Sequence, residues 1–113
     1  MLIYKVLTEA EYADLERLGE IPGSAADIAD GFVHLSTAEQ LPGTLAKHFA
    51  GQGGLWLLSL ESGDLGDALE WEPARDGALF PHLYAALRLS DVIEARPLMP
   101  DTDGRHPLPE VPG

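Results

Sequence analysis

The amino terminus of the chain has the pattern of a strand followed by a capped helix. Residues 2–7 are mostly apolar, with β-branched and aromatic side chains, which favours a β-strand. Thr8 and Glu11 match a capping box, in which each side chain accepts a hydrogen bond from the backbone amide of the other residue. Apolar side chains then recur at helical spacing, at Tyr12, Leu15 and Leu18. Gly19 suits the left-handed conformation that ends a helix.

The rest of the chain is predicted to hold shorter elements separated by turns. In the first half we expect a loop over 20–30 with a helical turn opened by Ser24, a strand over 32–36, and a helix opened by a capping box at 37–40 or starting at Pro42. In the second half we expect strands over 55–60, 69–72, part of 80–89, and 92–98. Helices first and strands later favour an α+β domain over a doubly wound sheet.

The composition fits one globular domain. The chain has 113 residues, of which 45% are hydrophobic, enough for an ordinary core. We expect residues 1–99 to form the domain. Residues 100–113 hold four of the nine prolines and are expected to be a loosely ordered tail. There is no cysteine, which excludes disulfides, thiolate metal sites and a catalytic thiol.

The charge narrows the range of partners. Nineteen acidic residues against seven basic ones give a net charge of −12, and such a surface repels nucleic-acid phosphates and anionic membranes. The amino terminus lacks the features of a signal peptide, and no apolar run approaches the roughly 20 residues that cross a bilayer. We therefore expect a cytoplasmic protein with a small-molecule ligand and neither a nucleic-acid nor a membrane partner. The oligomeric state stays open.

Two strand patterns carry the candidate chemistry. Each presents an aromatic ring, an imidazole and a hydroxyl on one face: Phe32, His34 and Ser36 on the first, and Phe80, His82 and Tyr84 on the second. Small-molecule sites commonly combine aromatic walls with a few converging polar groups. We expect His34 and His82 to face a shared hollow as hydrogen-bond donors, proton carriers or ligand anchors. A purely structural role for both imidazoles stays open.

Other polar residues are weaker candidates. Glu70 and Glu72 share a face of the predicted strand over 69–72, and a carboxylate at a strand end can act as a base or stabilise positive charge. Arg75 can bind a carboxylate or a phosphate, or can pair with a neighbouring acid. The spacing of the histidines and Glu72 does not demand a metal ion, so no metal site is predicted.

The two histidine motifs, Gly31–Thr37 and Leu79–Tyr84, together with Trp71-Glu72, resemble a small bacterial family known as domain-of-unknown-function family 952. The resemblance extends over about residues 3–98. It implies an ADP-ribosyltransferase-like fold, with a split mixed or antiparallel sheet and two or three helices. Residues 33–36 are also similar to the signature of NAD-dependent RNA 2′-phosphotransferases.

This resemblance implies a ligand as well as a fold. His34 and Ser36 would contact the nicotinamide ribose or a phosphate, and NAD is the cofactor it suggests. Two departures stand out: Lys5 follows Tyr4, where NAD-cleaving members of the fold often carry a histidine, and 79–84 holds no glutamate. Breaking a nicotinamide–ribose bond passes through an oxocarbenium-like state that a carboxylate stabilises, a role that Glu72 is left to fill.

The leading hypothesis is a domain that binds a nucleotide or NAD-like small molecule. If it is an enzyme, we expect ADP-ribosyl or phosphoryl transfer. The predicted catalytic residues are His34, His82 and Glu72, and the predicted ligand-binding residues are Phe32, Ser36, Thr37, Arg75, Phe80 and Tyr84. The alternative is a non-catalytic module that senses a metabolite or docks a protein, which the two departures favour. RNA-end processing is a third possibility that the net charge disfavours.

Overall fold

The computed structural model describes residues 1–74 and 77–108 of the chain. In these residues there are three α-helices: α1 (Glu9–Leu18), α2 (Ala25–Asp30) and α3 (Leu41–His48). The strands are β1 (Leu2–Thr8), β2 (Glu20–Ile21), β3 (Val33–His34), β4 (Ser36–Thr37), β5 (Leu55–Glu61), β6 (Leu69–Pro73), β7 (Leu79–Leu83), β8 (Leu87–Arg88) and β9 (Val92–Leu98). Two 3-10 helices, η1 (Ser62–Ala68) and η3 (Leu89–Asp91), link β5 to β6 and β8 to β9. The prediction of an α+β domain is confirmed.

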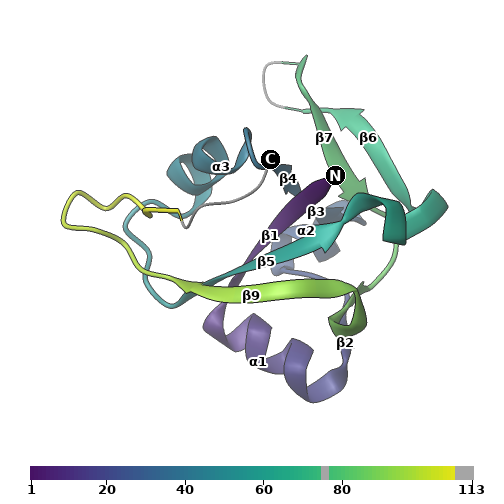
Figure 1. The fold of residues 1–113 in the computed structure, drawn as a ribbon, viewed down its shortest axis with the longest axis horizontal. Coiled ribbons are helices and arrows are strands. Elements are labelled where there is room, and N and C mark those ends of the chain that lie inside the picture. The colour runs from purple at the N-terminus through teal and green to yellow at the C-terminus, as the bar shows by residue number, and fades with distance from the viewer. Residues whose placement is uncertain (75–76, 109–113) are drawn as a thin grey trace.

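The strands form three antiparallel sheets (Figure 1). The largest has the order β4-β1-β5-β9, the second β3-β7-β6 and the smallest β2-β8. β5 lies between β1 and β9 and pairs with β1 along its whole length, from Leu55 opposite Thr8 to Glu61 opposite Leu2. The prediction of a central strand over 55–60 is therefore confirmed. Every strand pair among the described residues is antiparallel, so these sheets are not mixed.

The helix starts follow the side-chain caps. Thr8 and Glu11 form the predicted capping box at α1, and Gly19 ends this helix with a φ of 83°. The helical turn predicted at Ser24 is the complete helix α2, which a second capping box opens. The predicted box at 37–40 makes its reciprocal hydrogen bonds, but it forms a turn just before α3, which begins at Leu41.

The prediction of one strand over 32–36 is wrong. Val33 and His34 form β3 and pair with β7, whereas Ser36 and Thr37 form β4 and pair with β1 in a different sheet. Leu35 lies between them: its side chain is buried, and its backbone amide donates to the Pro81 carbonyl at 3.0 Å. Because the chain crosses from one sheet to the other at this residue, the simple alternation of faces does not extend through it.

Two apolar clusters cover the two faces of the largest sheet. Side chains alternate along β1, so neighbouring residues face opposite sides. Leu7 packs in one cluster with Leu15 of α1, and Val6 packs in the other with Leu41 of α3. Figure 1 shows α1 and α3 on opposite sides of the β1–β5–β9 region. The core therefore consists of two layers that share one central sheet.

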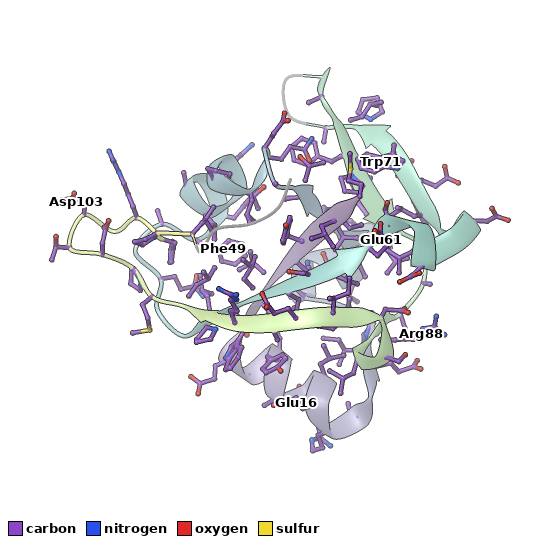
Figure 2. All side chains as sticks on the ribbon, in the orientation of Figure 1. Glu16, Phe49, Glu61, Trp71, Arg88 and Asp103 are labelled. Carbon is purple, nitrogen blue, oxygen red and sulfur yellow. The ribbon has the colours of Figure 1, made fainter. Side chains whose placement is uncertain are left out.

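The described part of the predicted tail folds back toward α3. The loop after β9 extends outward at Asp103, as Figure 2 shows. The chain then returns, and Nε2 of the buried His106 donates to the Gln52 carbonyl at 2.7 Å. Residues 109–113, which belong to the same predicted tail, lie outside the described residues. Each helix found in 1–74 and 77–108 is too short or too polar to span a lipid bilayer.

Replacing Leu58 with alanine is expected to lower the free energy of unfolding by about 3 kcal/mol, because a fully buried side chain of the central strand leaves a cavity. Leu18→Ala is the matched control, because it makes the same truncation at a side chain on α1 that is 57% exposed. We expect it to change the free energy of unfolding by less than about 0.5 kcal/mol. Urea denaturation followed by circular dichroism measures both. Equal losses of unfolding free energy in Leu58→Ala and Leu18→Ala would contradict the central position of β5.

Candidate functional site

The two larger sheets separate along β1, and the space between them is a cleft. β1 pairs with β4 only at Ile3 and Tyr4, and the chain preceding β4 leads away through Leu35 to the second sheet. The cleft has a volume of about 560 Å³ and is lined by side chains of β1, β3, β4, β7 and all three α-helices. We call it the β1–β3 cleft. Its volume lies in the usual range of small-molecule sites.

The two predicted imidazoles meet at this cleft. His34 and His82 are direct partners in the antiparallel pair of β3 and β7, and their ring centroids lie 5.7 Å apart. Both line the β1–β3 cleft. Phe32 stacks on the His82 ring at a centroid distance of 4.1 Å and contacts the His34 ring at 4.6 Å. Directly opposed residues of neighbouring strands share a sheet face, which explains how two distant motifs converge.

The His82 ring is buried but keeps one nitrogen available. The residue is 6% exposed, and Nδ1 donates to Oε1 of Glu72 at 2.8 Å. Its Nε2 has no hydrogen-bond partner among the described residues, and no fully buried side-chain polar atom in them lacks a partner. Nε2 is therefore not fully buried, and the His82 side chain lines the cleft. With Nδ1 donating, a neutral His82 presents Nε2 as a hydrogen-bond acceptor and potential base.

Glu72 orients His82 from outside the cleft. Its Oε1 also accepts a hydrogen bond from the Tyr84 hydroxyl at 2.7 Å. The hydrogen bonds from Tyr84 and His82 hold the pKa of Glu72 below its usual value. The hydrogen bond between Tyr84 and Glu72 also raises the pKa of Tyr84. Glu72 and Tyr84 do not line the described β1–β3 cleft. Tyr84 lines a neighbouring hollow of about 370 Å³ together with Phe32.

His34 is held by two carboxylates. Its Nδ1 lies 2.6 Å from Oδ1 of Asp27, and its Nε2 lies 2.9 Å from Oδ2 of Asp30. The contact of Nδ1 with Asp27 is a hydrogen bond, in which the imidazole N–H donates to the carboxylate. The His34 side chain is 38% exposed, and the ring bridges two residues of α2. Its nitrogens are therefore occupied by the protein itself.

A buried ion pair lies beneath His34 and was missed by the sequence reasoning. Lys5 Nζ lies 2.7 Å from Oδ2 of Asp27, with the two side chains only 6% and 1% exposed. Lys5 also donates to the His34 carbonyl at 3.1 Å, and Asp27 accepts from the backbone amides of His34 and Ser24. Burial alone would raise the pKa of Asp27, but the charge and hydrogen bond of Lys5, with the His34 hydrogen bonds, lower it overall.

Two sequence signals pointed to this network. Lys5 interrupts an otherwise apolar strand, and a strand residue facing a core is seldom charged unless it is paired. Ser24 and Asp27 have the spacing of a capping box, which the structure forms. Neither signal identifies the partner, because β1 and α2 are brought together only by the tertiary fold.

The remaining predicted residues divide between the cleft and other positions. Ser36 and Phe80 line the cleft, and the Ser36 hydroxyl lies 2.9 Å from that of Thr44. Thr37 hydrogen-bonds with Gln40 and does not line the described cleft. Arg75 lies outside the described residues. The cleft also includes His48 of α3, to which the sequence analysis gave no role.

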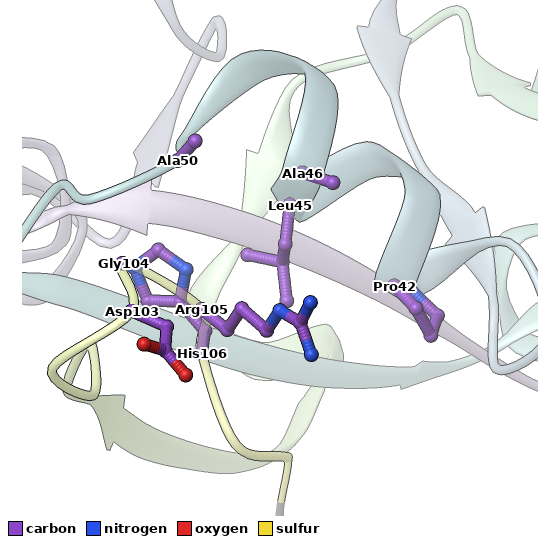
Figure 3. Close-up of a pocket in the computed structure, with 8 residues that line it drawn as sticks. All are labelled: Pro42, Leu45, Ala46, Ala50, Asp103, Gly104, Arg105 and His106. Atoms are coloured by element: carbon purple, nitrogen blue, oxygen red, sulfur yellow. The ribbon is translucent and has the colours of Figure 1, made fainter.

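Another hollow lies between α3 and the loop that follows β9 (Figure 3). It has a volume of about 320 Å³, and Arg105 extends beneath Leu45 toward Pro42. It contains none of the predicted site residues among those described, and its imidazole, His106, is engaged with Gln52. Over residues 1–74 and 77–108, no group of three or more His, Asp or Glu side chains is arranged to hold a metal ion. The β1–β3 cleft is therefore the principal candidate site.

Asp27→Asn is expected to lower the free energy of unfolding at pH 7 by about 3 kcal/mol, because it leaves the Lys5 ammonium buried without its counter-charge. The folded-state pKa of Asp27 is lowered, so its ionised form stabilises the fold above the ordinary value of 3.8, and that contribution is lost as the pH falls through the folded-state value. The difference in the free energy of unfolding between the unchanged protein and Asp27→Asn should therefore narrow as the pH falls through that acid range. Urea denaturation at several pH values measures it.

The matched control for this experiment is Asp14→Asn, which removes an exposed carboxylate paired with Arg17. We expect a change below about 0.5 kcal/mol. An Asp27→Asn protein as stable as the Asp14→Asn control would show that the buried ion pair does not support the fold.

Glu72→Gln is expected to bring the pKa of Tyr84 down toward its ordinary value of 10.0, because the carboxylate that disfavours the tyrosinate is removed. A ¹³C NMR titration of the tyrosine side chains measures this change. Tyr4 and Tyr12, whose pKa values are raised chiefly by burial, serve as internal references that should not move. An unchanged Tyr84 titration would contradict the hydrogen bond to Glu72.

Known structures and one sequence family are similar to this chain. Its fold is similar to the crystal structure of protein CC0527 from Caulobacter crescentus, with a TM-score of 0.92. The two sequences are 48% identical, and the match covers 95% of this chain and 94% of that chain. The solution NMR structure of CC0527 is 49% identical over 92% of this chain and 90% of that chain, with a TM-score of 0.83. No curated protein matches the sequence. The model of the family described as "Protein of unknown function (DUF952)" matches residues 6–95, and the chain belongs to this family.

Proposed function

We propose that the β1–β3 cleft binds a nucleotide or NAD-like small molecule. The observation that carries this proposal is His82, which is buried, lines the cleft, is fixed by Glu72 through Nδ1, and has no partner for Nε2 among the described residues. A fold gains no stability from an open polar atom on an otherwise buried ring, because buried polar groups are normally paired. A bound ligand would supply the hydrogen-bond partner that Nε2 lacks among the described residues.

The walls of the cleft suit such a ligand. Tyr4, Phe49 and Phe80 are aromatic residues of the cleft lining, and Ser36, His34 and His82 line the same cleft. Heteroaromatic bases pack well on aromatic side chains, and sugar hydroxyls need a few fixed donors and acceptors. The combination matches a molecule with a flat ring at one end and a polar sugar at the other.

We further propose that the fold is ADP-ribosyltransferase-like. Two features support this assignment: the order of a first strand, a helix and a Phe32–Thr37 motif, and the separation of two antiparallel sheets along β1. The β1–β3 cleft lies at this separation. In the same proposal the protein acts in the cytoplasm. Likeness of fold alone does not transfer an activity, so the chemistry rests on the site residues.

If the site is catalytic, His82 is its proton acceptor. A nucleophile that attacks the sugar carbon of an N-glycosidic bond would pass its proton to Nε2, while the base departs with the bond electrons. Glu72 holds the ring in the required orientation and stabilises the imidazolium that forms, as a carboxylate does for a catalytic histidine in hydrolases. Its expected role against the oxocarbenium is thereby replaced by a positioning role, because Glu72 does not line the described cleft.

A non-catalytic sensor is the second candidate, and a specific observation favours it. Lys5, which stands where NAD-cleaving members of the fold often carry a histidine, is buried in the ion pair with Asp27 and does not offer a free group to a ligand. Binding without bond cleavage would then be the whole function.

Titration of the ¹⁵N-labelled protein with NAD and with ADP-ribose tests the proposal. We expect amide shifts concentrated on β3 and β7. His82→Gln should weaken binding at least about tenfold, since a hydrogen bond in a buried site is worth about 1.5 kcal/mol. His106→Gln is the matched control, because His106 is also a buried imidazole but lies outside the cleft. An absence of cleft shifts at millimolar ligand would overturn the proposal.

Measuring free nicotinamide in the same samples separates the two candidates. Release of nicotinamide that depends on His82, and slows in Glu72→Gln while binding is retained, supports the enzyme. Saturable binding with no nicotinamide released supports the sensor.

A further inference from the structure

We propose that the β1–β3 cleft recognises a positively charged N-glycoside, such as the nucleoside of a pyridinium base, rather than the phosphate groups of a nucleotide. This inference rests on the proposed function and specifies the class of ligand that the same site takes.

The first observation is that the cleft offers no free ammonium or guanidinium group among its described residues. Lys5 is the one lysine or arginine that lines it there. Its Nζ is held 2.7 Å from Asp27 and 3.1 Å from the His34 carbonyl, and the side chain is 6% exposed. Phosphate sites in proteins usually present Arg or Lys donors to the oxygens. The Lys5 ammonium is instead neutralised by Asp27.

The second observation concerns His34, the group that the family resemblance placed against a phosphate or a ribose. Both of its ring nitrogens face carboxylates, at Asp27 and Asp30. A phosphate could bind this imidazole only by displacing a carboxylate and lying beside it, at a cost from the repulsion of like charges. His34 therefore serves to hold α2 against β3, and carboxylates already lie against both of its ring nitrogens before a ligand arrives.

The third observation is the negative charge that remains at the surface of the cleft. Asp30 is 56% exposed, and Glu11 of α1 also lines the cleft. The whole chain carries a net charge of −12, so little positive potential arises elsewhere to offset them. A cationic ring would be attracted by these carboxylates, and a pyrophosphate would be repelled.

The aromatic lining completes the match. Tyr4 and Phe80 are buried residues of the cleft lining, and Phe49, which also lines the cleft, is partly buried. A cation over an aromatic face gains about 0.5–2 kcal/mol, depending on how far it is desolvated. Nε2 of His82 then remains to accept a hydrogen bond from a sugar hydroxyl. The cleft thus offers aromatic residues and an imidazole to this ligand, whereas its described lining offers a phosphate no ammonium or guanidinium group that is free of a carboxylate.

Three probes that share their parts test the inference: nicotinamide riboside, its 5′-mononucleotide, and ADP-ribose. We expect the riboside and the mononucleotide to bind within about threefold of each other, and ADP-ribose at least about tenfold more weakly, since it lacks the cationic ring. Affinities come from amide shifts of β3 and β7 in the full chain. Tenfold tighter binding of the mononucleotide, or equal binding of ADP-ribose and the riboside, would overturn the inference.

A matched pair of variants locates the effect. Asp30→Asn should weaken the binding of the riboside about fivefold, because it removes an exposed carboxylate of the cleft. The affinity for ADP-ribose should not fall. Asp14→Asn, an exposed carboxylate on α1 that does not line the cleft, should change neither. Cleft shifts with ADP-ribose that equal those with the riboside would reject this inference but leave the proposed function standing. An absence of cleft shifts with all three probes would reject both.

Discussion

The buried ion pair between Lys5 and Asp27 is the interaction on which the arrangement of the site depends. It joins β1 of one sheet to α2, and Asp27 in turn holds both the backbone and the ring of His34 on β3. Charged groups taken out of water cost free energy unless they are paired and hydrogen-bonded, and each oxygen of Asp27 has partners. The pair thus fixes the position of α2 where the two sheets separate.

This constraint explains why a cleft exists between the sheets. Beyond Tyr4 no described residue of β1 pairs with β4, and Lys5 reaches β3 through its side chain rather than through a strand pair. Lys5 crosses the gap on the core side, so the sheets are tied together without closing it. The cleft is consequently part of the fold itself and not a surface irregularity, which makes it a suitable place for a ligand to bind against rigid elements.

The two histidines of the cleft have different environments and therefore different capacities. Both ring nitrogens of His34 lie close to carboxylates, Nδ1 at 2.6 Å from Asp27 and Nε2 at 2.9 Å from Asp30, and the residue is committed to the structure. His82 has one nitrogen bonded to Glu72 and one without a hydrogen-bond partner among the described residues. Two chemically identical side chains placed as direct cross-strand partners are thus assigned separate roles by their neighbours, which is how environment sets function in titratable groups.

The sequence by itself determined the local elements and the chemistry of the motifs. The strand over 2–7, the capped helix after it and the central strand over 55–60 follow from side-chain periodicity and capping, which depend on neighbouring residues. The approach of His34 to His82 was predicted from matching patterns, without a distance. Only the tertiary structure decided that residues 32–36 divide between two sheets at Leu35.

The tertiary structure also decided the partners of the charged groups. It brought Lys5 to Asp27 and Glu72 to His82, and it placed Tyr84 outside the cleft. Such contacts depend on strand register and on how α2 packs, and a shift of one residue in register turns every side chain to the opposite face. Side-chain patterns along a chain carry information on faces and ends, whereas the pairing of distant charges is set by the packing of whole elements.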